Sequence, residues 1–153
     1  MRLIFAPTKD SDAETLVRIR ISAMQESLER VGRFDPQRAR DRFLSSFEPS
    51  QCKFIIVDGQ QVGFVSMTLA PDHIALDHLY ITPGNQRKGI GALVLASIFR
   101  QADEKSLPLT VGALRDSDSI RFYMRHGFTR TGESDWDIYF IRIPIDNKLE
   151  SLR

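Results

Sequence analysis

The sequence predicts an α/β (α+β) protein, in which helices cover a mixed sheet. Two observations lead to this class. Segments with apolar side chains at strand or helix spacing follow one another in the order β-α-α-β-β-β-α-β-α-β-β. The chain has 153 residues, 42% of them apolar and 27% charged, which suits one globular domain with its own core. We therefore expect a single domain over residues 1–145, followed by a polar tail at residues 146–153.

Four segments are expected to be helices. The first begins at Ser11, which forms a capping-box pattern with Glu14, and it ends at Gly32. The second begins at Asp35, with a proline in its first turn. The third, residues 89–105, is apolar nearly all round, which predicts burial, and the fourth, residues 117–126, is closed by glycine. The inner faces of the first two helices are Val17, Ile21, Met24, Leu28 and Val31, and Ala39, Phe43 and Phe47.

Strands are expected where short runs rich in β-branched and aromatic residues lie between turn residues. Asp58-Gly59 predicts a tight hairpin between two of these runs, and Pro71-Asp72 and Ser134-Asp135 mark further turns. The expected strands are residues 2–6, 53–57, 61–69, 74–81, 109–114, 128–133 and 137–143.

Charge and cysteine content exclude several classes of protein. The net charge of +1 lacks the basic excess of a dedicated nucleic-acid binder and gives no reason to bind an anionic membrane. Cys52 is the only cysteine, so intrachain disulfides and cysteine zinc sites are excluded, and a cytoplasmic location is expected. The first apolar run ends at Pro7, too early for a signal peptide, and no stretch is long enough to span a membrane.

The most informative segment is the glycine-rich loop, residues 84–91, between the fourth strand and the third helix. Glycines let backbone N–H groups approach an anion, and the first N–H groups of a helix favour negative charge, so the loop predicts a phosphate site. It is no P-loop, because Ile90 and Gly91 follow Gly89 in place of Lys and Ser/Thr. It also lacks the third glycine of the dinucleotide fingerprint. A helix entry that binds nothing is the alternative.

Two motifs resemble the GNAT superfamily of N-acetyltransferases. The run Gln86-Arg87-Lys88-Gly89-Ile90-Gly91 is similar to the family's Q/R-x-x-G-x-G/A loop, and Leu79-Tyr80-Ile81-Thr82-Pro83 is similar to its fourth strand. Residues 116–128 resemble the segment N-x-x-A-x-x-F-Y-x-x-x-G-F, with two departures. Asp116 stands where the family often has Asn, and Ser119 where it often has Ala. A carboxylate at position 116 accepts a hydrogen bond but donates no amide N–H.

The resemblance implies a mostly antiparallel, twisted sheet of about seven strands with about four helices, whose strands four and five splay apart around acetyl-CoA. Backbone groups of Leu79, Tyr80 and Ile81 would pair with the pantetheine arm, and one N–H there would stabilise the developing oxyanion. Asp116 and Tyr123 would also contact acetyl-CoA, and no metal is implied. In the family the glycine loop binds the pyrophosphate, a role that falls here on Gln86, Arg87, Lys88, Gly89, Ile90, Gly91 and Ala92.

Tyr123 is the candidate general acid, because the resemblance implies that this tyrosine protonates the departing CoA thiolate. An ordinary tyrosine has a pKa of about 10 and a thiol a pKa of about 8.5, so full proton transfer is uphill by roughly 2 kcal/mol. Transfer during cleavage of the carbon–sulfur bond avoids most of that cost. The alternative is that Phe122 and Tyr123 only pack in the core.

The base that takes the amine proton is less well defined. An alkylamine of pKa about 10.4 is almost wholly protonated at neutral pH, so a lysine-like acceptor requires a base. Asp77 and His78 alternate on the fourth strand, so at most one of them faces the substrate. The family often has an acid near the start of this strand, where this chain has His73 and Ala75, and Asp77 shares their parity. Asp77 is therefore preferred to His78, the alternative being that both are ordinary surface residues.

The resemblance implies an N-acetyltransferase that transfers an acetyl group from acetyl-CoA to a primary amine by direct attack in a ternary complex. The alternative is a non-catalytic acyl-CoA-binding sensor or partner module with the same fold, and Tyr123 favours the enzyme. The acceptor is a small-molecule or peptide amine. No sequence motif identifies this amine, and none indicates whether the protein also transfers acyl groups other than acetyl. A homodimer is one option for the oligomeric state.

Overall fold

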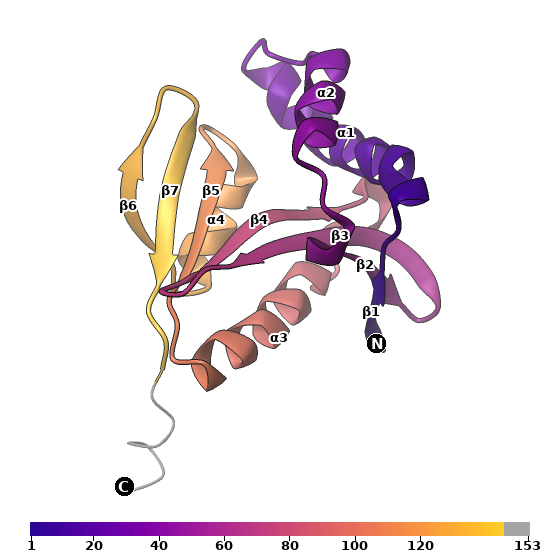
Figure 1. Ribbon diagram of the computed structural model, residues 1–153. Helices are drawn as coiled ribbons and strands as arrows, with labels where there is room; N and C mark the ends of the chain where they lie inside the picture. Colours follow the sequence, from indigo (N-terminus) through magenta and orange to yellow (C-terminus); the bar gives the residue numbers. More distant parts are fainter. Residues whose placement is uncertain (146–153) are drawn as a thin grey trace, which may run out of the picture. The chain divides into compact units, whose positions relative to one another are not determined.

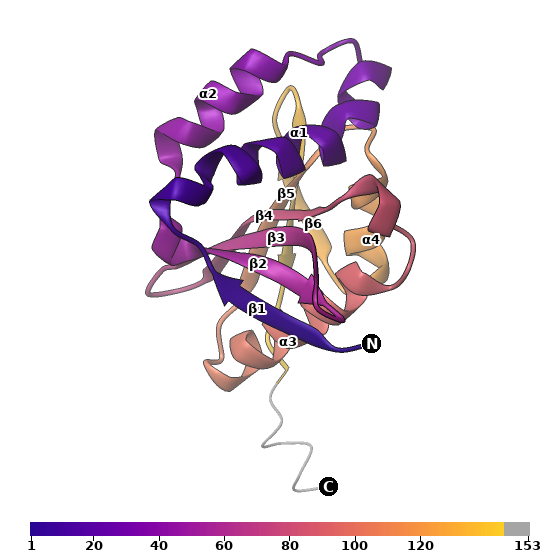
Figure 2. The same ribbon diagram turned by 90° about the vertical axis from the view of Figure 1, so that its right-hand side faces the viewer.

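The computed structural model describes residues 1–145, and the expected polar tail at residues 146–153 lies outside the described residues. The strands are β1 (Leu3–Pro7), β2 (Cys52–Val57), β3 (Gln60–Leu69), β4 (Ile74–Ile81), β5 (Leu109–Leu114), β6 (Thr129–Glu133) and β7 (Asp137–Arg142). The α-helices are α1 (Ala13–Arg30), α2 (Pro36–Ser46), α3 (Ile90–Glu104) and α4 (Asp118–Arg125). This order along residues 1–145 confirms the expected α/β fold (Figures 1 and 2).

All the strands of residues 1–145 belong to one 7-stranded sheet with the order β1-β2-β3-β4-β5-β7-β6. The pairs β1–β2, β2–β3, β5–β7 and β6–β7 are antiparallel, whereas β4 and β5 are parallel. The ladder between β4 and β5 runs only from Ile74 with Leu109 to Leu76 with Val111. The sheet is mostly antiparallel, as expected, and the early end of this ladder is consistent with the expected separation of the fourth and fifth strands.

The chain divides into two compact units. The first contains Met1–Met67 and His78–Gly91, and the second contains Thr68–Asp77 and the described part of Ala92–Arg153. Strands β3 and β4 and helix α3 therefore contribute residues to both units. The expectation of a single domain over residues 1–145 stays a prediction.

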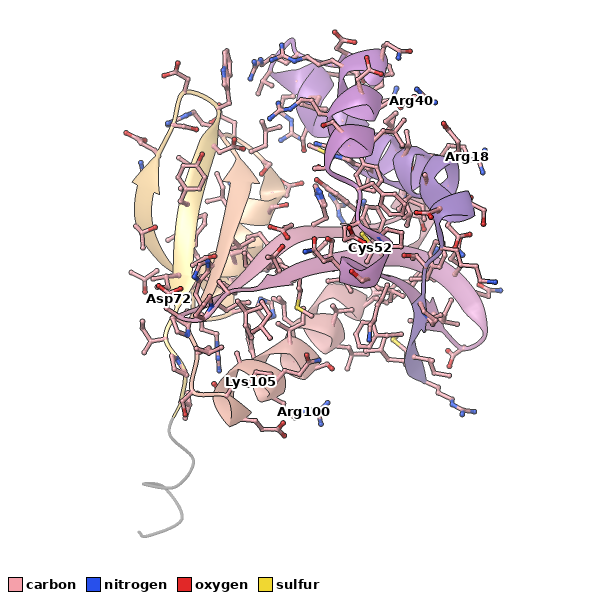
Figure 3. The ribbon with its side chains drawn as sticks, in the orientation of Figure 1. Arg18, Arg40, Cys52, Asp72, Arg100 and Lys105 are labelled. Atoms are coloured by element: carbon pink, nitrogen blue, oxygen red, sulfur yellow. The ribbon has the colours of Figure 1, made fainter. Side chains whose placement is uncertain are left out.

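Helix α1 begins differently from the prediction. Ser11 lies in a short 3-10 turn, Asp10–Asp12, and the α-helix starts only at Ala13. The Glu14 carboxylate pairs with the guanidinium of Arg40, which Figure 3 labels on α2. The predicted capping box is wrong because Ser11 lies inside this turn, where Oδ2 of Asp12 accepts a hydrogen bond from the backbone N–H of Lys9 at 2.8 Å.

Other predicted ends of elements are confirmed. Gly32 follows α1 with φ +72°, a conformation that glycine adopts without strain. At the start of α2, Oδ1 of Asp35 accepts a hydrogen bond from the backbone N–H of Arg38 at 3.1 Å. Asp58 and Gly59 have φ of 50° and 80° in the hairpin between β2 and β3. These ends depend on contacts a few residues apart, which is why the sequence predicts them.

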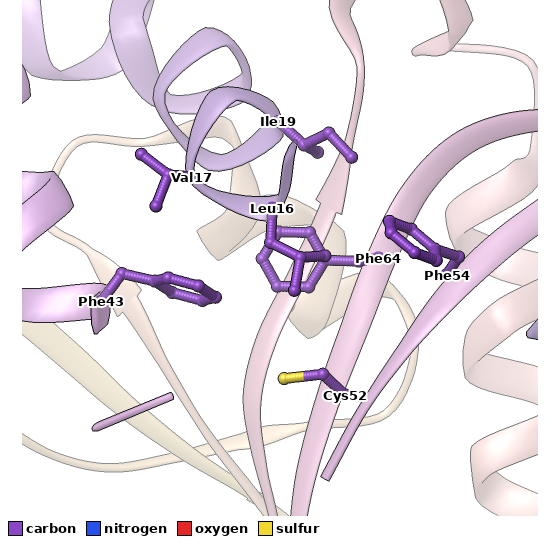
Figure 4. Packing of buried hydrophobic residues seen from close by; sticks show 7 residues of the cluster. All are labelled: Leu16, Val17, Ile19, Phe43, Cys52, Phe54 and Phe64. Carbon is purple, nitrogen blue, oxygen red and sulfur yellow. The ribbon is translucent and has the colours of Figure 1, made fainter. Parts of the chain in front are cut away.

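The core of the first unit lies where α1 and α2 cover β2 and β3 (Figures 2 and 4). Phe64 of β3 is fully buried, and the ring of Phe43 from α2 meets it edge-on with centroids 5.7 Å apart. The single cysteine is a core residue, buried on β2. The buried cluster consists of Leu16, Val17, Ile19, Phe43, Cys52, Phe54 and Phe64.

In the second unit, β5, β7 and β6 form an antiparallel sheet with α4 beside it (Figure 1). Helix α3 buries Leu95 and Ile98 but exposes 40% of Leu93, so the expected burial nearly all round is wrong, and one side faces solvent. Asp103 accepts two hydrogen bonds from Arg142, at 2.9 and 3.1 Å, which lower the pKa of its carboxyl. Among the described residues, no helix combines the length and the apolar character needed to cross a membrane.

Candidate functional site

Hydrogen bonds hold the turn that leads from β4 into the glycine loop. The backbone N–H and Oγ1 of Thr82 both donate to the carbonyl oxygen of Val62 on β3, at 2.9 and 3.2 Å. Nδ2 of Asn85 donates to Oγ1 of Thr82 at 2.8 Å. Nε2 of Gln86 donates to the carbonyl oxygen of Ile81 at 2.8 Å. The Gln86 side chain therefore ties the loop back to the end of the strand.

The loop backbone is shaped for an anion. Arg87 and Gly89 have φ of 63° and 81°, whereas Lys88 between them does not have positive φ. Alternating signs of φ are found where successive backbone N–H groups turn toward one side and bind an anion. Helix α3 begins at the next residue, Ile90, and its first turn contains no acidic residue. The positive end of the helix is thus unopposed within its own first turn, which suits a phosphate group.

The expected pantetheine-binding strand residues, Leu79, Tyr80 and Ile81, are all half-buried in the first unit. The Tyr80 ring packs against Phe64 with centroids 5.5 Å apart, so its side chain serves the core. A Cβ built on Gly63 of β3 would lie 2.0 Å from the carbonyl oxygen of Tyr80. Gly63 was not among the predicted site residues, although a glycine inside an apolar strand is a known sign of close backbone approach.

Asp77 and His78 have different surroundings, as strand alternation predicts. Asp77 is exposed in the second unit, and its Oδ2 accepts a hydrogen bond from Oγ1 of Thr68 at 2.6 Å. His78 is half-buried in the first unit, and its ring centroid lies 5.6 Å from that of Phe43 and 5.6 Å from that of Tyr80. Only Asp77 of the two therefore combines solvent exposure with a polar neighbour.

Burial, and to a lesser extent the positive charge of Arg20, together lower the pKa of His78 from 6.5 to about 4. The ring is therefore neutral at neutral pH. Its Nδ1 is buried and has no hydrogen-bond partner within residues 1–145.

The other predicted site residues belong to the second unit. Tyr123 on α4 is only 5% exposed, and its ring meets that of Phe128 edge-on with centroids 5.2 Å apart. The ring is thus packed in the core, while the expected role of its hydroxyl stays a prediction. Asp116 is exposed with φ 67° between β5 and α4, and Ala92 is half-buried in α3. The loop up to Gly91 belongs to the first unit.

Within the described part of the chain, no three His, Cys, Asp or Glu side chains form a group that could hold a metal ion. The sequence reasoning did not single out Arg20, whose charge acts on His78 from α1. No local pattern could have indicated this electrostatic interaction, since the two residues lie far apart in the sequence and are brought near each other only by folding.

The order of the sheet and the glycine loop before α3 are the features expected of a GNAT fold. A family model described as "Acetyltransferase (GNAT) domain" matches residues 49–130, which is more than half of the chain. The chain belongs to this family of GNAT acetyltransferases, as its loop and α4 motifs predict. A search of curated proteins gives no significant match.

Many solved structures share the fold. The PaiA N-acetyltransferase from Thermoplasma acidophilum, in complex with coenzyme A, has a TM-score of 0.76 and 15% identity, covering 94% of this chain and 99% of that chain. An acetyltransferase from Thermus thermophilus has a TM-score of 0.72 and 17% identity, and the match covers 94% of this chain and 97% of that chain. The ribosomal-protein-S18-alanine N-acetyltransferase from Escherichia coli has a TM-score of 0.69 and 15% identity, covering 94% and 96%. At such identities the likeness shows the fold.

Proposed function

We propose that the protein transfers an acetyl group from acetyl-CoA to a primary amine by direct attack in a ternary complex. The observation that carries this proposal is the anion-shaped loop, with positive φ at Arg87 and Gly89 directly before the N-terminus of α3. Membership of the acetyltransferase family supports it, as does the coenzyme A complex of the Thermoplasma relative.

The loop residues suit the pyrophosphate of acetyl-CoA. Residues 86–89 are exposed, so their backbone N–H groups and the side chains of Arg87 and Lys88 are accessible to a ligand. The early end of the ladder between β4 and β5, at Leu76, supports pairing of the pantetheine arm with the backbone of residues 79–81. We infer that Ala92 and Asp116 also contact the coenzyme.

Two side chains are proposed to move protons. The acetyl-CoA thioester supplies an activated acyl carbon. Tyr123 would donate its hydroxyl proton to the sulfur as the carbon–sulfur bond breaks. Asp77 would take the proton that the amine loses as the carbon–nitrogen bond forms. Asp77 is preferred to His78 because it is exposed, with Thr68 bonded to one carboxylate oxygen, whereas His78 faces aromatic rings.

The test of the proposed function is acetyl-CoA turnover with a panel of amino acids, peptides, polyamines and other small amines, followed by release of free thiol. Release that depends on one class of amine, with the acetylated amine identified by mass spectrometry, is the expected result. Calorimetric binding of acetyl-CoA with no thiol release for any amine would instead favour a binding module. Absence of both binding and release would contradict the proposal.

The acceptor and the cellular location are also proposals. The name of one relative with this fold refers to an alanine of a ribosomal protein as its acceptor, which supports a peptide or small-molecule amine here. A cytoplasmic location is supported by the single cysteine, Cys52, which is buried in the core. A homodimer stays one option for the oligomeric state, and size-exclusion chromatography with light scattering would test it.

A further inference from the structure

Two buried nitrogen atoms of the first unit have no hydrogen-bond partner. They are Nε of Arg20 on α1 and Nδ1 of His78 on β4. Buried polar atoms are nearly always hydrogen-bonded, so an unpartnered one calls for an explanation. Here two such atoms belong to side chains that interact electrostatically with each other. Both side chains also contact α2, Arg20 at Ala39 and His78 at the Phe43 ring, so one further group could bond to both nitrogens.

The charge of Arg20 indicates the sign of that third group. Its Nη1 donates to the carbonyl oxygen of Ala39 on α2 at 2.8 Å, a neutral acceptor. None of the ion pairs within residues 1–145 includes Arg20, whereas Arg40 and Arg142 each pair with a carboxylate. A half-buried guanidinium without a counter-charge favours an anion, and its planar fork matches a carboxylate.

The surroundings of His78 strengthen this preference. Its imidazole lies among the rings of Phe43, Phe64 and Tyr80, with centroids 5.6, 6.1 and 5.6 Å away. Aromatic walls exclude water and lower the local dielectric, which makes a hydrogen bond to a charged group stronger. In the tautomer with its proton on Nδ1, a neutral His78 donates to one carboxylate oxygen while Arg20 donates to the other.

We propose that Arg20 and His78 form a carboxylate-binding subsite for the acceptor, so that the protein acetylates amines that also carry a carboxylate, such as amino acids or peptides. This inference rests on the proposed function. Asp77, the proposed base, lies on the opposite face of β4 from His78. The subsite binds only the carboxylate of the acceptor, and its test does not depend on which side chain takes the amine proton.

The test uses matched pairs of acceptors, each an amino acid and its carboxamide, with thiol release as the readout. The carboxamide lacks the charged hydrogen bond that the carboxylate makes. Its kcat/KM is therefore expected to be lower by about tenfold or more, mostly because its KM is higher. In an Arg20→Gln variant the two acceptors of a pair become nearly equal. The matched control is Arg18→Gln, because Arg18 lies on the exposed side of α1, where its guanidinium donates to Oγ1 of Thr15 at 3.3 Å (Figure 3). The Arg18→Gln variant is expected to keep the wild-type preference for the acceptor with a carboxylate.

A second readout separates the subsite from the activity. The ring nitrogens of His78 are followed by NMR while wild-type protein is titrated with sodium acetate, with acetamide and sodium chloride as controls. A shift with acetate alone that Arg20→Gln abolishes supports the subsite even if no amine is acetylated. Wild-type protein without preference for the carboxylate acceptors and without an acetate-dependent shift would overturn the inference. The two nitrogens would then be bonded by buried water.

Discussion

The carbonyl oxygen of Tyr80 on β4 occupies the space that a side chain on residue 63 of β3 would require. The distance from this oxygen to a Cβ built on Gly63 is 2.0 Å, far inside any real contact. The two strands thus approach each other closely at Tyr80, one of the residues proposed to bind the pantetheine arm. A glycine in β3 therefore sets the position of the β4 backbone.

Replacing Gly63 by alanine is expected to destabilise the protein by about 1–3 kcal/mol or more, because backbone must shift to relieve the overlap. The measurement is the free energy of unfolding by chemical denaturant. Gly132→Ala is the matched control, since Gly132 also lies in a strand and a Cβ there meets nothing within 4 Å. Equal stability of the two variants would show that β3 and β4 are not in this close register.

Gly89→Ala is expected to weaken acetyl-CoA binding about tenfold or more. A side chain at φ +81° is strained, and relaxation of the loop would misdirect N–H groups whose bonds to a charged ligand are worth about 1.5–3 kcal/mol each. Isothermal calorimetry measures the affinity. Gly59→Ala imposes the same strain at φ +80° in the β2–β3 hairpin, also with open space around the Cβ. That control should lose stability to a similar degree and keep its affinity.

Lys88→Ala is expected to slow the association of acetyl-CoA about twofold or more at low salt, because an exposed cation beside the loop attracts the phosphates. Added salt should shrink the difference between variant and wild type. Stopped-flow fluorescence measures the rate. Lys105→Ala removes the same charge just beyond the last turn of α3 (Figure 3). If both variants slowed association equally, overall charge and not the loop would be responsible.

Tyr123→Phe is expected to lower kcat by about 10²–10⁴-fold while acetyl-CoA affinity changes little, because the ring and its packing remain and only the proton donor is lost. Steady-state thiol release with the best amine measures kcat. Tyr139→Phe is the control, since this exposed tyrosine donates its hydroxyl to Oγ of Ser134 at 3.2 Å in the same unit. Full turnover by a folded Tyr123→Phe variant would refute the donor role and leave the fold assignment unchanged.

The free energy of unfolding is expected to decrease as the pH is lowered from 6.5 to about 4, in part because of His78. The folded protein holds this pKa at about 4, whereas in the unfolded chain it returns to 6.5, so across this window the unfolded chain binds the extra proton. One proton corresponds to at most about 1.4 kcal/mol per pH unit. The difference in unfolding free energy between wild type and His78→Gln should therefore change with pH in this window and be constant above it. A difference independent of pH would contradict the burial of His78.

The sequence by itself determined the order of the elements, most of their ends and the candidate coenzyme loop. Gly32, the Asp35 cap and the Asp58-Gly59 hairpin act through hydrogen bonds and φ preferences within a few residues, so local patterns suffice to predict them. The glycine loop is likewise one continuous segment. Its motif and its geometry before α3 agree because both depend on the same short stretch of backbone.

Only the tertiary structure decided which distant side chains meet. Glu14 pairs with Arg40 in place of forming a capping box, and Arg20 acts on His78 across two elements. The burial of the Tyr123 ring and the need for glycine at position 63 likewise follow from packing. Residue type and spacing define what each side chain can do. Which partner it finds depends on the competition among all groups that folding brings within reach, and that competition leaves no local pattern in the sequence.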